Sequence, residues 1–224
     1  IAAAKESGIF HNILVSSESE EYGRLAESYG ALWVRRSPQF AADDSPDFDW
    51  VQEVMEISAA DAFAILRPTS PFRSAMTIRN AWEWFQAKGE RFDSLRAVEP
   101  PKQHPWKMWV PSGEGMRPLF DDRTAGQPSH SVPTQLLANI WAQNASLEIA
   151  WTKTLEKYRT ISGEHVLPFF SGGYEGYDLN TEDDWQYAEW LILTGRAKLP
   201  VIPQTGQVEE PVKVRAPRGR PRKK

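Results

Sequence analysis

The sequence has no cysteine among its 224 residues and only four histidines. A disulfide framework, a thiolate nucleophile and a cysteine-based zinc or iron–sulfur site are therefore excluded. No apolar run approaches the ~18 residues of a membrane-spanning helix, and no signal-peptide pattern opens the chain. We expect a protein of the cytoplasm with no membrane partner.

Apolar residues make up 41% of the chain and ten residues are tryptophan, which is enough to build a sizeable core. Charge is placed unevenly. The segment from Lys213 to Lys224 holds seven basic and no acidic residues, whereas the rest of the chain holds 19 basic and 30 acidic residues, a net charge of −11. An acidic body is a poor general surface for nucleic acid, so we expect it to bind anions through a few placed cations or a metal ion.

Strand-like and helix-like segments alternate over the first 200 residues. Short apolar runs predict strands at 13–16, 32–34, 62–66, 94–98, 146–151 and 164–170. Apolar spacing and helix-end residues predict helices at about 17–29, 45–58, 74–89, 152–158 and 181–194. Ser17 with Glu20 has the spacing of a capping box, and Pro46 is expected at the first helical position.

This alternation predicts an α/β fold, with a mainly parallel, Rossmann-like sheet and helices on both faces. Residues 99–135 are rich in proline and glycine and too long for an ordinary connection, so they form either a functional excursion or a dimerisation arm. We expect one α/β domain over 1–200 and a disordered basic tail over 201–224.

The first candidate site is the segment LRPTSPFR, from Leu66 to Arg73, directly after a predicted strand. Ligands of open α/β sheets bind beyond the carboxyl ends of strands. Arg67 and Arg73 can pair with carboxylate or phosphate, Thr69 and Ser70 supply hydroxyls, and two prolines stiffen the loop. The alternative is a plain strand-to-helix turn with solvated arginines.

The second candidate is YEGYDLNTEDDW, from Tyr174 to Trp185. Asp178 and Asn180 are two residues apart, so they face the same side of an extended segment and offer oxygen ligands that suit Mg²⁺. The alternative is that Asn180 or Thr181 caps the last helix, whose first turn is acidic. Both interpretations can hold together, because cap and ligand need not be one residue.

The third candidate combines KQHPWKMW, from Lys102 to Trp109, with NASLEIAW, from Asn144 to Trp151. Cations, amides and indoles are interleaved in these two segments. They suit either a bound sugar acid or base, or a packed arm with no ligand.

Together these segments resemble the acylneuraminate cytidylyltransferase family, the synthetases of CMP-sialic acid and of related CMP-linked 2-keto sugar acids. The stretches ILVSSESEE and VRRSPQFAADDSP are similar to two further family motifs, and LRPTSPFR, KQHPWKMW and YDLNTEDDW to three more. The five motifs stand in the family's order and cover about 5–195.

The resemblance implies transfer of a cytidylyl group from CTP to a 2-keto sugar acid, with release of pyrophosphate, by a Rossmann-like protein that dimerises through an extended arm. It implies that Asp178 and Arg73 are catalytic and that Asp178 and Asn180 hold Mg²⁺. The implied substrate-binding residues are Arg36, Asp44, Ser45, Arg67, Thr69, Ser70, Gln103, Lys107 and Asn144.

The sequence departs from the family pattern in two ways. The family's first strand and its basic Gly/Ser-rich loop, which holds the CTP triphosphate, do not occur in it. We therefore expect that Ile1 is not a native start, and that this fragment is inactive and poorly stable because a missing central strand leaves unpaired edges. Asn180 stands where the family has a second Asp, and Arg67 stands where many members have Gln. An alternative is therefore a relative that binds the nucleotide sugar without catalysing its formation.

The C-terminal PRGRPRKK, from Pro217 to Lys224, resembles an AT-hook, a basic element that lies in the minor groove of DNA. A DNA-associated protein acting through this tail is the second alternative. The alternative without specific DNA binding is a basic tail that is exposed to solvent.

Overall fold

The computed structural model describes residues 1–202. Its elements alternate between strand and helix, which confirms the predicted α/β class. The AT-hook-like segment 217–224, and all of the predicted tail except Val201 and Ile202, lie outside the described residues.

The main sheet has four strands in the order β10 (Val166–Phe170), β4 (Ser94–Glu99), β9 (Ala142–Trp151) and β3 (Ala62–Ile65). β10 runs parallel to β4, whereas β9 runs antiparallel to both β4 and β3. The sheet is therefore mixed. The reason is topological: β4 leads out into a long excursion and β9 leads back beside it, so the returning strand has the opposite direction.

A second sheet pairs β1 (Leu14–Ser17) with β2 (Leu32–Arg35) in parallel. The carbonyl of Ser17 in β1 accepts a hydrogen bond from the Arg36 amide. The backbone groups of β1 that hydrogen-bond toward β2 therefore belong to odd-numbered residues. Successive residues of a strand point their backbone N–H and C=O groups toward alternate edges. The backbone groups of Leu14 and Ser16 therefore face the edge of β1 that lies away from β2. Among residues 1–202, β1 pairs only with β2 and β3 only with β9.

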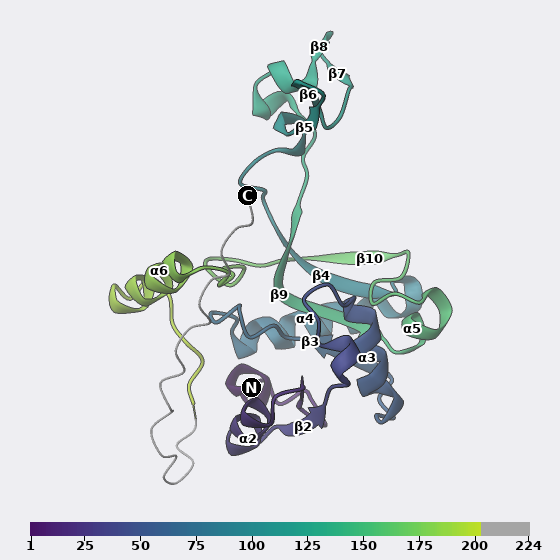
Figure 1. Cartoon of the computed structure of the whole chain (residues 1–224), viewed down its shortest axis with the longest axis vertical. Helices are drawn as coiled ribbons and strands as arrows, with labels where there is room; N and C mark the ends of the chain where they lie inside the picture. The colour runs from purple at the N-terminus through teal and green to yellow at the C-terminus, as the bar shows by residue number, and fades with distance from the viewer. Residues whose placement is uncertain (203–224) are drawn as a thin grey trace.

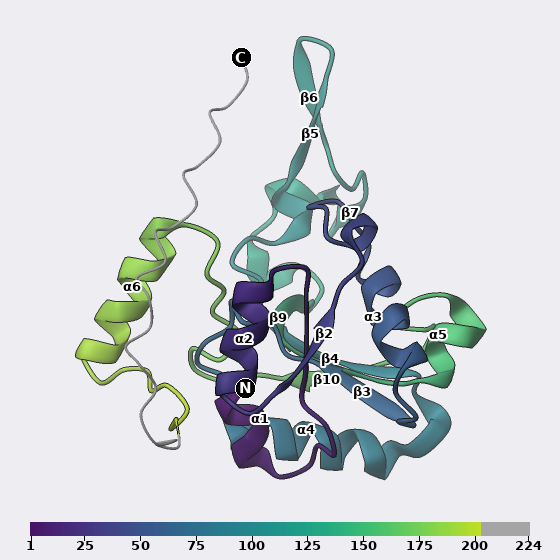
Figure 2. The same cartoon turned by 60° about the horizontal axis from the view of Figure 1, so that its bottom comes forward.

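The helices are α1 (Ala2–Ser7), α2 (Glu20–Ser28), α3 (Asp47–Glu56), α4 (Ala75–Lys88), α5 (Lys153–Tyr158) and α6 (Glu182–Leu193). The sequence analysis predicts all except α1, which packs against α4 (Figure 2). Gly89 ends α4 with φ +58°, as predicted for a residue that needs no Cβ.

Two predicted helix starts are wrong in detail. Ser19, not Ser17, is the N-cap of α2, and its hydroxyl accepts from the Tyr22 amide. Ser17 cannot take this place because it is the last residue of β1 and pairs with Arg35. Pro46 is the N-cap of α3 rather than its first helical residue.

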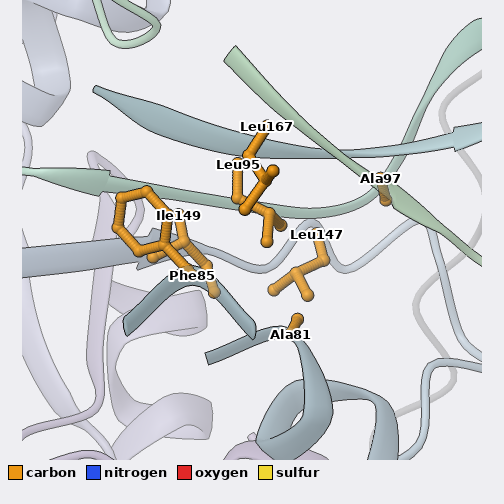
Figure 3. Close-up of a cluster of buried hydrophobic side chains, with 7 residues drawn as sticks. All are labelled: Ala81, Phe85, Leu95, Ala97, Leu147, Ile149 and Leu167. Carbon is orange, nitrogen blue, oxygen red and sulfur yellow. The ribbon is translucent and has the colours of Figure 1, made fainter. Parts of the chain in front are cut away.

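The main core lies between α4 and one face of the four-stranded sheet. It is drawn in Figure 3 and consists of Ala81, Phe85, Leu95, Ala97, Leu147, Ile149 and Leu167. Leu147 and Ile149 are two residues apart on β9 and so share this face. The opposite face is covered by α3 and α5, where Val51, Ile65 and Leu155 are buried together. Glu148 is also on this second face.

The excursion between β4 and β9 forms the arm that extends away from the sheet (Figures 1 and 2). It contains two small hairpins, β5 (Trp109–Ser112) with β6 (Gly115–Pro118) and β7 (Arg123–Thr124) with β8 (Gln127–Pro128). The predicted excursion over 99–135 is therefore present, as a structured arm. Within residues 1–202, no helix is long and apolar enough to cross a membrane.

The packing of Leu147 gives a stability prediction. Its side chain is fully buried, so Leu147→Ala loses buried apolar surface and leaves a cavity. We expect the free energy of unfolding to fall by about 3 kcal/mol in urea titration. Leu193→Ala is the control, because Leu193 is the last residue of α6 and is 85% exposed. An equal loss in both variants would contradict the assignment of the core.

Candidate functional site

The loop after β3 is held by the buried guanidinium of Arg73. Its Nη1 donates to the carbonyl of Ser146 on β9, and both Nη1 and Nη2 donate to the carbonyl of Arg67, at 3.4 and 3.3 Å. Burial lowers the pKa of Arg73 to about 10, while the negative charge of Glu175 acts in the opposite direction. A pKa of about 10 still leaves Arg73 charged at neutral pH. This cation therefore fastens the two ends of the loop to the neighbouring strand.

Four buried polar atoms around this loop have no hydrogen-bond partner among the described residues. They are Ser70 Oγ, Arg73 Nε, Ser146 Oγ and Asp178 Oδ1. Buried polar groups in proteins are nearly always hydrogen-bonded, so an orphaned group calls for a specific explanation. The two hydroxyl groups and the cationic donor suit an anionic ligand or water molecules, whereas the carboxylate oxygen suits a hydrogen-bond donor or a cation.

The segment after β10 reaches the same place. The Leu179 amide donates to the carbonyl of Thr69 at 2.9 Å, and Tyr177 packs against Phe72 with ring centroids 6.1 Å apart. The Glu175 carboxylate accepts from the amide of Ser74 at the start of α4. The structure thus brings together the first two candidate segments, although 100 residues separate them.

Asp178 and Asn180 are adjacent in space, as their spacing predicts. Asp178 Oδ2 accepts from Asn180 Nδ2 at 2.9 Å, which leaves Asp178 Oδ1 as the orphaned oxygen. Thr181 caps α6 in a capping box with Asp184, and the hydrogen bonds of Thr181 and the Asn180 amide lower the pKa of Asp184. The cap and the candidate ligand are therefore different residues. No cluster of three or more His, Cys, Asp or Glu side chains able to hold a metal occurs in residues 1–202.

Arg67 has a different environment from Arg73. Its Nη2 lies 2.5 Å from Asp47 Oδ2, at the start of α3, and 3.0 Å from Glu148 Oε1 on β9. The other oxygen of Glu148 pairs with Arg96 Nη1. Burial raises the pKa of Asp47, but the hydrogen bonds and charge of Arg67 outweigh this and leave the pKa below its ordinary value. Two cations and two carboxylates therefore form one compensated network.

Arg36 lies at the far end of this network. It donates from Nε and Nη2 to Ser16, both at 3.0 Å, and its guanidinium stands 4.9 Å from the centre of the Trp50 ring. Trp50 Nε1 in turn donates to Asp47 Oδ1. Ser45 donates to the Gln39 carbonyl at 3.3 Å, and Asp44 is exposed.

The remaining predicted residues are placed elsewhere or are already bonded. Lys107 Nζ donates to the carbonyls of His130 and Val132 inside the arm, and Gln103 is exposed at the arm's base. Asn144 donates to Glu99 Oε2 and Ser171 Oγ and accepts from the Ser146 amide. Asn144 therefore joins β4, β9 and the end of β10.

The sequence analysis missed several groups that shape this site. They are Asp47, Glu99, Ser146, Glu148 and Glu175. One signal was available. Glu148 stands between Leu147 and Ile149 in an apolar run, and an acid in a buried strand needs a cationic partner. Arg96 interrupts its own strand in the same way.

Solved structures share this fold at low sequence identity. The chain superposes on CMP:2-keto-3-deoxy-manno-octonic acid synthetase complexed with CTP with a TM-score of 0.58, at 10% identity, over 87% of each chain. It superposes on 4-diphosphocytidyl-2C-methyl-D-erythritol synthase from Anaerococcus prevotii with a TM-score of 0.59, at 10% identity, over 86% of this chain and 88% of the other. The protein therefore has the α/β fold of these two synthases.

No protein-family model matches the chain, but individual relatives do. It is 30% identical over 206 residues to CMP-N,N'-diacetyllegionaminic acid synthase of Legionella pneumophila, covering 86% of this chain and 82% of the relative. It is 38% identical over 87 residues to N-acylneuraminate cytidylyltransferase of Escherichia coli, where the match spans 38% of this chain and only 21% of that protein. The chain belongs to the acylneuraminate cytidylyltransferase family, together with the CMP-legionaminic acid synthases.

Gly176 offers a test of the packing beneath the site. A Cβ at this position would lie 2.1 Å from Glu99 Oε2 and 2.6 Å from Asn144 Nδ2. Gly176→Ala must therefore displace these side chains, and we expect a loss of about 1–3 kcal/mol in the free energy of unfolding. Gly172→Ala is the matched control, because a Cβ there meets no atom within 4 Å. Equal stability of the two variants would show that the segment does not pack as described.

The lowered pKa of Asp47 gives a pH prediction. A carboxylate with a lowered folded-state pKa stabilises the fold fully above its ordinary pKa and loses this effect as the pH falls. We expect the stability of the wild type to fall more steeply than that of Asp47→Asn between about pH 5 and pH 2. Urea titrations across this range measure the difference. Asp49→Asn, on the same helical turn, should keep the wild-type slope, and a wild-type slope in Asp47→Asn would contradict the prediction.

Proposed function

We propose that this protein transfers the cytidylyl group of CTP to a 2-keto sugar acid of the sialic or legionaminic acid type. Family membership supports the reaction class, and the relative that matches along most of its length makes a CMP-linked sugar acid. The observation that carries the proposal is the set of orphaned polar atoms around Arg73, at the meeting point of the two candidate segments. A buried cation with a free donor suits an anionic substrate.

In the proposed reaction, the anomeric hydroxyl oxygen of the sugar acid bonds to the α-phosphorus of CTP. The bond from that phosphorus to the bridging oxygen of the β-phosphate breaks, pyrophosphate leaves, and the hydroxyl proton passes to solvent water. Such transfers depend mainly on positioning and on stabilising negative charge. Arg73 supplies fixed positive charge, and the hydroxyls of Ser70 and Ser146 supply hydrogen bonds that orient the substrate.

We propose that Mg²⁺ is the cofactor and that Asp178 and Asn180 hold it. The orphaned Oδ1 of Asp178 is a hard oxygen ligand of the kind that Mg²⁺ prefers, and the ion usually takes one or two carboxylates with substrate phosphates. When bound, Mg²⁺ would neutralise charge on the phosphates. Asp178 itself is fixed by the hydrogen bond from Asn180 and by the Leu179–Thr69 backbone contact.

The test is pyrophosphate release by the purified natural protein that contains this chain. We expect release that needs CTP, Mg²⁺ and a 2-keto sugar acid together. Arg73→Lys keeps the charge but loses the planar donor, and we expect its kcat/KM to fall about 100-fold. Arg91→Lys, in the short turn that follows α4, should match the wild type. Absence of release with every 2-keto sugar acid tried would refute the proposal.

We further propose that the arm joins two copies of the chain. Its exposed apolar side chains support this: Trp109, Met116, Phe120 and Leu136 are between 43% and 65% exposed. A segment that leaves several large apolar side chains exposed is a candidate for an interface. We expect light scattering to give about twice the mass of one chain at micromolar concentration. A single-chain mass at every concentration tested would contradict the dimer.

One observation favours a second candidate function. Asn180 leaves the candidate metal site with a single carboxylate, Asp178, which suits a protein that binds the nucleotide and the sugar acid without turnover. Calorimetry would then detect binding while pyrophosphate release stays absent, and Asn180→Asp would not restore it. Release by the wild type dismisses this candidate.

A further inference from the structure

Arg67 lies in the candidate loop, but its donors face carboxylates of the protein. Nη1 lies 3.3 Å from Asp47 Oδ1, while Nη2 lies 2.5 Å from Asp47 Oδ2 and 3.0 Å from Glu148 Oε1. These contacts raise the pKa of Arg67, the hydrogen bond with Asp47 most of all, so the group stays charged. Its positive charge is compensated before any substrate arrives.

Glu148 connects this pair to the middle of the sheet. It is only 4% exposed and stands in register with Ile65 on β3 and Arg96 on β4. One carboxylate oxygen accepts from Arg67 and the other from Arg96, whose Nη2 donates to Ser162 Oγ at 2.6 Å. Since a buried carboxylate is costly unless paired, Glu148 holds both arginines in place.

The same network sets the position of Arg73. The guanidinium of Arg73 rests on two carbonyls, that of Arg67 and that of Ser146. Arg67 is fixed through its side chain by Asp47 and Glu148. Of the two supports of Arg73, the Arg67 carbonyl belongs to the residue whose side chain Asp47 and Glu148 hold. The Ser146 carbonyl is fixed by the backbone of β9.

We propose that Asp47, Glu148 and Arg67 are positioning residues that fix the loop 66–73 and aim the free Nε of Arg73 at the substrate. Arg67 then does not bind the sugar acid, in contrast to the role that the family resemblance implies. This inference rests on the proposed function for the identity of the substrate. The positioning itself is measurable without any substrate.

Asp47→Asn separates the two roles of Arg67. If Arg67 is a positioning residue, losing its strongest partner loosens the loop, and the KM for the sugar acid rises about tenfold. If Arg67 binds the sugar acid, the same change frees its charge, and KM stays constant or falls. Asp47 lies at the half-exposed start of α3, so the variant should fold. Unchanged or lower KM in Asp47→Asn would overturn the proposal.

A double-mutant cycle tests the pairing without ligand. We expect Asp47→Asn and Arg67→Gln each to lower the folding equilibrium constant about tenfold, between the costs of exposed and buried pairs. In the double variant Glu148 stays paired with Arg96. Its folding equilibrium constant should therefore be at least about fivefold higher than the two single losses multiplied together would give. The exposed pair of Arg24 and Glu20 is the control, with a coupling of about twofold. Simple additivity at Asp47 and Arg67 would overturn the proposal.

Hydrogen exchange of the peptide 66–74 completes the test. We expect faster exchange in Asp47→Asn and in Glu148→Gln than in the wild type, with no change in the peptide that covers α6. Unchanged exchange in Asp47→Asn would overturn the positioning role, even where Glu148→Gln does not fold. Absence of pyrophosphate release by the wild type would refute the proposed function alone, because the cycle and the exchange rates need no substrate.

Discussion

The site depends on a buried guanidinium that bonds to backbone carbonyls instead of carboxylates. Arg73 donates to the carbonyls of Arg67 and Ser146, so it joins the loop after β3 to the neighbouring strand while its charge stays uncompensated at close range. Burial lowers its pKa to about 10, which is the cost of keeping such a cation from water. A charge held in this way is available to an anionic ligand.

The nearby arginine shows the contrast. Arg67 is a few residues away, yet Asp47 and Glu148 neutralise it, and it shares Glu148 with Arg96. Two arginines that look equivalent in LRPTSPFR thus have opposite electrostatic roles. The difference arises from the strands: β9 places a carbonyl beside one guanidinium and a carboxylate beside the other. The mixed sheet, in which β9 returns from the arm between β4 and β3, makes this arrangement possible.

Much of the fold and part of the site follow from local patterns in the sequence. Apolar runs and helix-end residues such as Ser74, Gly89 and Thr181 predict elements that occur nearly where expected. Long-range pairing is beyond such patterns. Nothing near Asp47 or Glu148 indicates that both meet Arg67, because the contacts join residues 20 and 81 positions apart. The hydrogen bonds of Lys107 within the arm and of Asn144 between strands are long-range in the same way, and local patterns do not predict them.

The most direct test of the account is a crystal structure of the natural protein with CTP or a CMP-linked sugar acid bound. The account predicts an anionic group of the ligand within hydrogen-bond distance of Arg73 Nε, with a ligand or metal contact at Asp178 Oδ1 and Arg67 still on Asp47 and Glu148. The account would be contradicted by a ligand bound at another face of the protein, with Arg73 Nε still lacking a partner or hydrogen-bonded only to water.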